Sequence, residues 1–225
     1  MDKNTKKQWY DDACGTALAL ELVGERWSLL IVRELLLGGL RFSDLRAGLS
    51  GLSANVLTQR LHRLEGAGIV RRRRLPPPAS VQVYELTAWG MEAEPVVMAL
   101  ARWALRSPAH DPMLHFSPVA LLLSLKMLLV PERVGDFAAR VGFRLGVQGF
   151  VAEIADGAMT AARDDLTHVD AVLSADVTNA FLPVFYGGMP LAGALAAGMV
   201  RLEGDGDVAT RFSRLFSLPP KAAVD

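Results

Sequence analysis

The segment that most constrains the fold is residues 53–74, where a helical pattern stops at two glycines and is followed at once by four arginines. Ser53 is suited to cap a helix N-terminus, and Gly66 and Gly68 end the pattern near residue 65. The apolar positions recur at helical spacing and form one seam: Leu57, Leu61 and Leu64. This order predicts a short amphipathic helix with one buried face and one polar face.

The polar face of this predicted helix carries side chains that can bond base edges: Asn55, Thr58, Gln59, His62 and Arg63. Asn and Gln match adenine, Arg matches guanine, and Thr can contact the thymine methyl group. The helix N-terminus behind Ser53 also favours a phosphate. An ordinary solvent-exposed face would be equally polar, so the helix alone does not distinguish DNA binding from simple exposure to solvent. The segment that follows the helix bears on this choice.

That following segment predicts a hairpin, with strands over residues 70–75 and 81–86 and a proline-rich turn over 76–80. Its first strand carries four adjacent arginines: Arg71, Arg72, Arg73 and Arg74. Contact with phosphates explains such a block better than a solubilising charge run does. Side chains alternate along a strand, so we expect two arginines on each face and not all four on DNA.

The rest of the first half is predicted to be helical, and the charge pattern suggests two domains. Helices are expected over residues 14–23, 25–37, 43–46 with Ser43 as N-cap, and from 87 or 89 to 106. Residues 1–106 hold 15 Lys and Arg against 11 Asp and Glu, and residues 107–225 hold 9 against 13. A basic half and an acidic half, with prolines at 107–112 between them, predict domains at 1–106 and 107–225.

Residues from about 14 to 103 resemble the HxlR family of winged helix-turn-helix transcriptional regulators, which is related to the MarR group. The matching motifs are GERWSLLIVRELLL at 24–37, RFSDL at 41–45, LSANVLTQRL at 52–61, LEGAGIV at 64–70 and YELTAWG at 84–90. The resemblance implies a bacterial or archaeal protein that binds double-stranded DNA. It further implies a homodimer, joined through residues around 9–22 and 89–106, on a palindromic operator, and we expect a repressor.

Cys14 matches a position where several members of that family carry a redox-sensing cysteine. A thiolate near a helix N-terminus has a lowered pKa, although Asp11 and Asp12 oppose that effect. A structural role is the alternative. Since Cys14 is the single cysteine, the chain cannot form an internal disulfide.

The second half predicts a mixed pattern, so the whole chain is expected to be α+β. Helices are predicted at 118–129, 177–186, 191–197 and 207–216, and strands at 137–154, 169–173 and 199–203. From about residue 169 the chain resembles sterol carrier protein type two domains. The motifs are ADVTNAFLPVFYGG at 175–188, LAGALAAGMVRLEGDG at 191–206 and FSRLF at 212–216.

This second resemblance implies an apolar tunnel for a hydrophobic small-molecule effector. The residues that could line it are Phe181, Leu182, Val184, Phe185, Met189, Leu195 and Met199. Alternatively, these side chains fill an ordinary core, or the domain extends a dimer interface.

No enzymatic motif, metal site or cofactor site is found in the sequence, and no run is long enough to span a membrane. His110 and His115 lack a third strong ligand for a metal. We therefore expect a cytoplasmic, non-enzymatic DNA-binding regulator that needs no cofactor. The alternative is a hydrophobic-ligand carrier or scaffold whose winged helix contacts other proteins.

Overall fold

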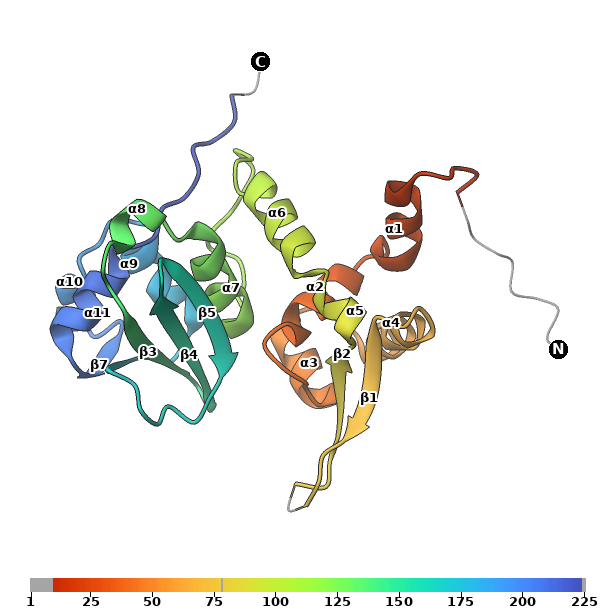
Figure 1. Cartoon of the computed structure of the whole chain (residues 1–225), viewed down its shortest axis with the longest axis horizontal. Coiled ribbons are helices and arrows are strands. Elements are labelled where there is room, and N and C mark those ends of the chain that lie inside the picture. Colours follow the sequence, from red (N-terminus) through yellow and green to blue (C-terminus); the bar gives the residue numbers. More distant parts are fainter. Residues whose placement is uncertain (1–9, 78, 224–225) are drawn as a thin grey trace. The chain divides into compact units, whose positions relative to one another are not determined.

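A computed structural model describes residues 10–77 and 79–223 (Figure 1). Its internal contacts divide the chain into two compact units, Met1–Glu94 and Pro95–Asp225. The division falls earlier than the sequence pattern suggested, because the end of helix α6 (Glu94–Ala104) is tied to the second unit. Arg102 Nη1 donates to Met127 O at 3.0 Å, and Ala222 N donates to Arg106 O at 2.8 Å. Where the DNA-binding domain ends in functional terms stays a prediction.

The first unit is a helical domain with a two-stranded antiparallel hairpin. Its elements in chain order are α1 (Gly15–Val23), α2 (Ser28–Leu35), α3 (Phe42–Gly48), α4 (Ala54–Gly66), β1 (Val70–Arg74), β2 (Gln82–Leu86) and α5 (Ala88–Met91). Fully buried side chains of α2, α3 and α4 form its core: Ile31, Leu45, Leu57 and Leu64. An isolated bridge between Leu40 and Tyr84 adds a third short segment beside β2. This helix-and-hairpin order confirms the winged helix-turn-helix prediction.

Two predictions in the first unit were wrong in detail. Helix α3 begins at Phe42, after Arg41, and Ser43 does not cap it, since Ser43 Oγ donates to the Asp44 carboxylate at 3.1 Å. The long helix expected from residue 87 or 89 to 106 is two helices, α5 and α6. Pro95 has no N–H to donate, so a helix tolerates it in the first turn, and α6 begins one residue before it.

The second unit is a five-stranded mixed sheet with helices packed on it (Figure 1). Its helices are α6, α7 (Pro118–Leu128), α8 (Pro131–Val134), the short 3₁₀ helix η1 (Thr178–Phe181), α9 (Leu182–Phe185), α10 (Leu191–Ala196) and α11 (Gly206–Ser213). Its strands are β3 (Ala139–Leu145), β4 (Gln148–Ala155), β5 (Ala158–Arg163), β6 (Ala171–Ala175) and β7 (Arg201–Gly204). The strand order is β5-β4-β3-β6-β7, and β3 and β6 are the parallel pair. The α+β prediction is confirmed.

The sequence pattern merged or missed several elements of this unit. The single strand expected over residues 137–154 is the hairpin β3–β4, in which Leu145 pairs with Gln148 and Gly146 takes a φ of 61° at the turn. Strand β5 was not predicted, because its residues alternate only weakly between small and polar types. The helix expected over residues 177–186 is the pair η1 and α9, which meet between Phe181 and Leu182.

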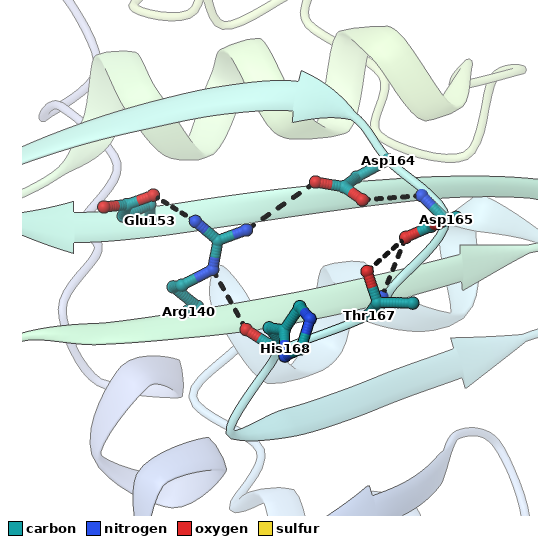
Figure 2. Close-up of polar contacts among 6 residues, drawn as sticks. All are labelled: Arg140, Glu153, Asp164, Asp165, Thr167 and His168. Atoms are coloured by element: carbon teal, nitrogen blue, oxygen red, sulfur yellow. Dashed lines mark hydrogen bonds and ion pairs between the residues drawn. The ribbon is translucent and has the colours of Figure 1, made fainter.

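Arg140 of β3 anchors the loop between β5 and β6 (Figure 2). Its Nη1 donates to Glu153 of β4 at 2.8 Å, and its Nε donates to His168 O at 3.1 Å. Its Nη2 lies 3.6 Å from the Asp164 carboxylate. The loop approaches the sheet closely enough that a Cβ atom at Gly149 would lie 2.3 Å from Asp164 O. One guanidinium thus joins two strands to the loop that crosses them.

Candidate nucleic-acid interface

Helix α4 is fixed at its start by Ser53 and along its length by a buried leucine seam. Ser53 Oγ accepts a hydrogen bond from Val56 N at 3.3 Å, which confirms the predicted N-cap. Each leucine of the seam is at most 1% exposed: Leu57, Leu61 and Leu64. The helix ends at Gly66, and Gly68, with a φ of 75°, turns the chain into β1. Helix α4 and the hairpin β1–β2 are therefore consecutive parts of one packed unit.

The opposite face of α4 is open to solvent. All five predicted base-reading side chains are exposed: Asn55, Thr58, Gln59, His62 and Arg63. Thr58 Oγ1 donates to Ala54 O at 2.9 Å, so this hydroxyl is already used inside the helix. The structure brings the five residues onto one exposed helical face, and their contact with bases stays a prediction.

Two arginines of α4 are held by a carboxylate from the segment between α1 and α2. Both Arg60 Nη1 and Arg63 Nη1 form ion pairs with the two oxygens of Glu25. Arg60 Nε also donates to Arg26 O at 3.0 Å. This role of Glu25 was not predicted, because nothing in the local sequence indicates a partner more than thirty positions away.

The wing, β1–β2, displays all four arginines to solvent, on alternate faces. Arg71 Nε and Arg73 Nε donate to the two carboxylate oxygens of Glu85, at 2.8 and 2.6 Å. Arg72, on the other face, donates to Glu65 of α4 at 2.7 Å. The predicted alternation of the arginines is confirmed. Arg74 has no carboxylate partner among residues 10–77 and 79–223.

These ion pairs change the proton affinity of the groups involved. Burial raises the pKa of Glu85, but hydrogen bonds from Arg73 and Arg71 outweigh this, so the pKa is lowered overall. The hydrogen bond to Glu65 and the nearby Tyr84 raise the pKa of Arg72. Glu85 was visible in the sequence as a strand residue, and an antiparallel hairpin register would have placed it opposite Arg71.

Cys14 is exposed and sits at the N-cap of α1. Its Sγ accepts a hydrogen bond from Thr16 N at 3.4 Å, and this bond is the main cause that lowers the pKa of the thiol. Cys14 N in turn donates to the Asp12 carboxylate at 2.8 Å. Redox sensing stays a prediction. Trp9, at the start of the segment expected to dimerise, lies outside the described residues.

In the second unit, the seven residues predicted to line a ligand tunnel divide into two groups. Phe181, Val184 and Phe185 are buried, and the two rings belong to an aromatic cluster with Phe143, Phe212 and Phe216. The other four are half-buried: Leu182, Met189, Leu195 and Met199. The buried group packs in the core and the half-buried group is partly accessible from solvent, and a ligand role of either group stays a prediction.

Two hollows on the surface of the second unit are lined by other residues. One, open and of about 740 Å³, lies among the side chains of Arg133, Asp207, Thr210, Arg211, Arg214 and Leu215. In the described part of the chain, no three His, Cys, Asp or Glu side chains are grouped to hold a metal ion. No described helix combines the length and apolarity needed to cross a membrane.

Comparisons with known proteins agree with the geometry of the first unit. A family model described as HxlR-like helix-turn-helix matches residues 22–111. The uncharacterized HTH-type transcriptional regulator YvaP of Bacillus subtilis (strain 168) is 38% identical over 86 residues, which are 38% of this chain and 80% of YvaP. The uncharacterized HTH-type transcriptional regulator YtfH of Escherichia coli (strain K12) is 36% identical over 94 residues, 42% of this chain and 75% of YtfH.

Among solved structures, the reduced form of the transcriptional regulator YodB from B. subtilis is similar at 30% identity and a TM-score of 0.40. That match covers 44% of this chain and 100% of the YodB chain. The family model ends at residue 111 and leaves the sheet of the second unit unmatched. Since the chain covers most of YvaP at 38% identity, it belongs to the HxlR-like helix-turn-helix family.

Proposed function

We propose that this protein is a DNA-binding transcriptional regulator that places α4 in the major groove and the wing beside the flanking phosphates. One observation carries the proposal: the exposed polar face of α4 is followed directly by a strand with four exposed arginines. A major groove admits an α-helix, and a cationic hairpin beside it neutralises the backbone. The relatives named as HTH-type transcriptional regulators support the same function.

Within this proposal the side chains have separate tasks. Asn55 and Gln59, near the N-terminal end of α4, are suited to adenine, and helix-turn-helix proteins read bases with that end of the helix. Ser53 and the first turn of α4 favour a phosphate. Arg71 and Arg73 share the one carboxylate of Glu85, so their face of the wing keeps a net positive charge, and Arg74 offers charge on the other face.

We further propose that the regulator is a homodimer on a palindromic operator. Helix α1 exposes Leu18 and Leu20. Helix α6 contains no buried residue and exposes Val96, Leu100 and Trp103 at helical spacing, as one apolar stripe. Exposed apolar stripes of this kind are common at interfaces between protein chains. Two copies would present two reading helices to two half-sites.

For the second unit we propose a sterol-carrier-like domain that takes an apolar effector, with the whole protein acting as a repressor. The half-buried Leu182, Met189, Leu195 and Met199 support this proposal, because methionine adapts to irregular ligands. An effector that binds one arrangement of the dimer more tightly would shift the population away from the DNA-binding arrangement. Native mass spectrometry of the purified protein, with thermal shifts across a lipid panel, tests this part.

The DNA-binding proposal is tested by selecting duplexes from a random pool with the full-length protein. We expect enrichment of a palindromic sequence that binds much more tightly than a scrambled duplex. Gln59→Ala should relax the preference at one base position in each half-site, and Arg71→Ala with Arg73→Ala should weaken binding to all sequences. Gln148→Ala, a change of the same type in β4, is the control. If DNA affinity and sequence preference are unchanged by the substitutions at Gln59, Arg71 and Arg73, a protein-contact role for the wing is favoured instead.

A further inference from the structure

The turn that joins α1 to α2 has an unusual backbone. Trp27, the N-cap of α2, has a φ of 81°, in the left-handed region that bulky residues avoid. Such a conformation persists only when surrounding contacts hold it in place. Two contacts lie at this turn: the Arg26 guanidinium is 5.2 Å from the centre of the Trp27 ring, and Arg26 O accepts a hydrogen bond from Arg60 at 3.0 Å.

The same turn contacts helix α4, the proposed base-reading helix, through Glu25. Its carboxylate, 32% exposed, forms ion pairs with Arg60, 18% exposed, and with Arg63, 53% exposed. Arg60 is the better buried of the two and is also bonded to the backbone of the turn, so its place is structural. Arg63 is held by Glu25 alone among the ion pairs of the described residues.

Arg63 lies in the last turn of α4, away from the N-terminal end that reads bases. A free arginine at that place would be attracted to any phosphate, whatever the base sequence. Glu25 supplies a competing anion inside the protein. We propose that Glu25 is a positioning residue that withholds Arg63 from the DNA backbone and so determines how strongly the protein prefers its operator to other DNA. This inference rests on the proposed function, since it concerns the regulation of the same DNA-binding surface.

The test compares wild type with Glu25→Gln on a selected duplex and on a scrambled duplex of equal length, by fluorescence anisotropy across a salt series. The full-length protein is used. In the variant, affinity for the scrambled duplex should rise about threefold to tenfold at low salt, and the plot of log affinity against log salt should steepen by about 0.9, the value for one added phosphate contact. The preference for the selected duplex should fall accordingly.

Three further variants make the result specific. Glu25→Asp keeps the charge and should bind like wild type. Glu203→Gln, a matched loss of a carboxylate that accepts from Arg144 at 2.7 Å in the second unit, should change neither slope nor preference. Arg63→Gln, added to Glu25→Gln, should abolish the gain in affinity. Additive effects of the two substitutions, or an unchanged slope in Glu25→Gln, would overturn the inference.

These measurements distinguish failure of the proposed DNA-binding function from failure of the proposed role of Glu25. If wild type selects no duplex and binds none at low salt, the DNA-binding function itself is wrong, and the role of Glu25 falls with it. If wild type prefers a selected duplex but Glu25→Gln keeps that preference, only the role of Glu25 is wrong. Circular dichroism melting establishes that each variant is folded. If Glu25→Gln does not fold, the single variant Arg63→Gln provides the test. If Glu25 withholds Arg63 from the DNA backbone, this variant should show almost no loss of affinity for either duplex.

Discussion

Arg72 and Tyr84 lie directly opposite one another in the wing, and the Arg72 guanidinium carbon is 5.5 Å from the centre of the Tyr84 ring. The same guanidinium donates to Glu65 of α4 at 2.7 Å. Tyr84 N and O both bond to Leu40, so the ring's own backbone is fixed to the segment before α3. Arg72 therefore connects the wing to the reading helix, and its charge is already partnered within the protein.

This difference between the wing arginines gives the first prediction. Arg74→Gln should weaken binding to all duplexes several-fold and reduce the salt slope by about one, because its guanidinium has no carboxylate partner in the part of the chain that the structure describes and can contact a phosphate. Arg72→Gln, the matched control on the same face, should change the slope less, because Glu65 already neutralises it. The measurement is anisotropy across a salt series. Equal slopes for the two variants would contradict the assignment.

The sequence pattern was sufficient for the parts of the fold that depend on local periodicity. The leucine seam of α4, the Ser53 cap and the alternation of the wing arginines all follow from spacing within one segment. The partners of Arg63 and Arg72 did not follow, because Glu25 and Glu65 come from other elements, whereas Glu85 lies on the paired strand of the same hairpin. Only chain folding determines which carboxylate meets which guanidinium.

In the second unit, too, contacts between distant elements could not be predicted from local sequence. Phe181 and Phe185 were equally suited by type to a tunnel or to a core, and the decision depends on rings from β3 and α11. Phe143 lies 5.6 Å from Phe181, and Phe212 lies 6.1 Å from Phe185, between ring centres. A single sequence does not reveal such contacts between strands and helices distant along the chain. Strand β5 was missed because its residues lack strong β-forming character.

The second prediction concerns acid stability. The pKa of Glu85 is lowered in the folded protein, so its contribution to the free energy of unfolding is present above its unfolded value, near 4.5, and is lost as the pH falls through the folded value. Glu85→Gln should be less stable than wild type at pH 7, by about 1 kcal/mol at most, and this difference should shrink on acidification. Urea unfolding from pH 7 to pH 3 measures it. The double variant Arg71→Gln with Arg73→Gln should lose the same pH-dependent part, and a difference constant with pH would argue against the ion pairs.

The third prediction tests the loop that crosses the sheet of the second unit. Gly149→Ala should lower the free energy of unfolding by about 2–3 kcal/mol, because its Cβ would lie 2.3 Å from Asp164 O. The loop would have to move, and the contact between Arg140 and Asp164 would be disturbed (Figure 2). Gly193→Ala in α10 is the control, since its nearest contact is an ordinary 3.8 Å. That helical position should be neutral or gain about 0.5–1 kcal/mol, as judged by urea unfolding. Equal stability of both variants would refute the close approach.

The fourth prediction addresses the apolar stripe of α6. Leu100 is 46% and Trp103 is 72% exposed in the single chain, which is costly unless a partner covers them. Wild type should therefore have twice the single-chain mass of 24.3 kDa by light scattering at micromolar concentration. Leu100→Glu with Trp103→Glu should weaken dimerisation at least about a hundredfold, because each buried large side chain contributes about 1.5–3 kcal/mol.

The control for this prediction is Val147→Glu, which changes a fully exposed apolar residue in the turn between β3 and β4. It should leave the mass and the DNA affinity as in wild type. In the α6 variant, affinity for a palindromic duplex should fall much more than affinity for a single half-site, because two linked reading helices bind a palindrome together. A monomeric wild type that still prefers the palindrome, or an α6 variant that remains dimeric, would exclude this helix as the dimer contact.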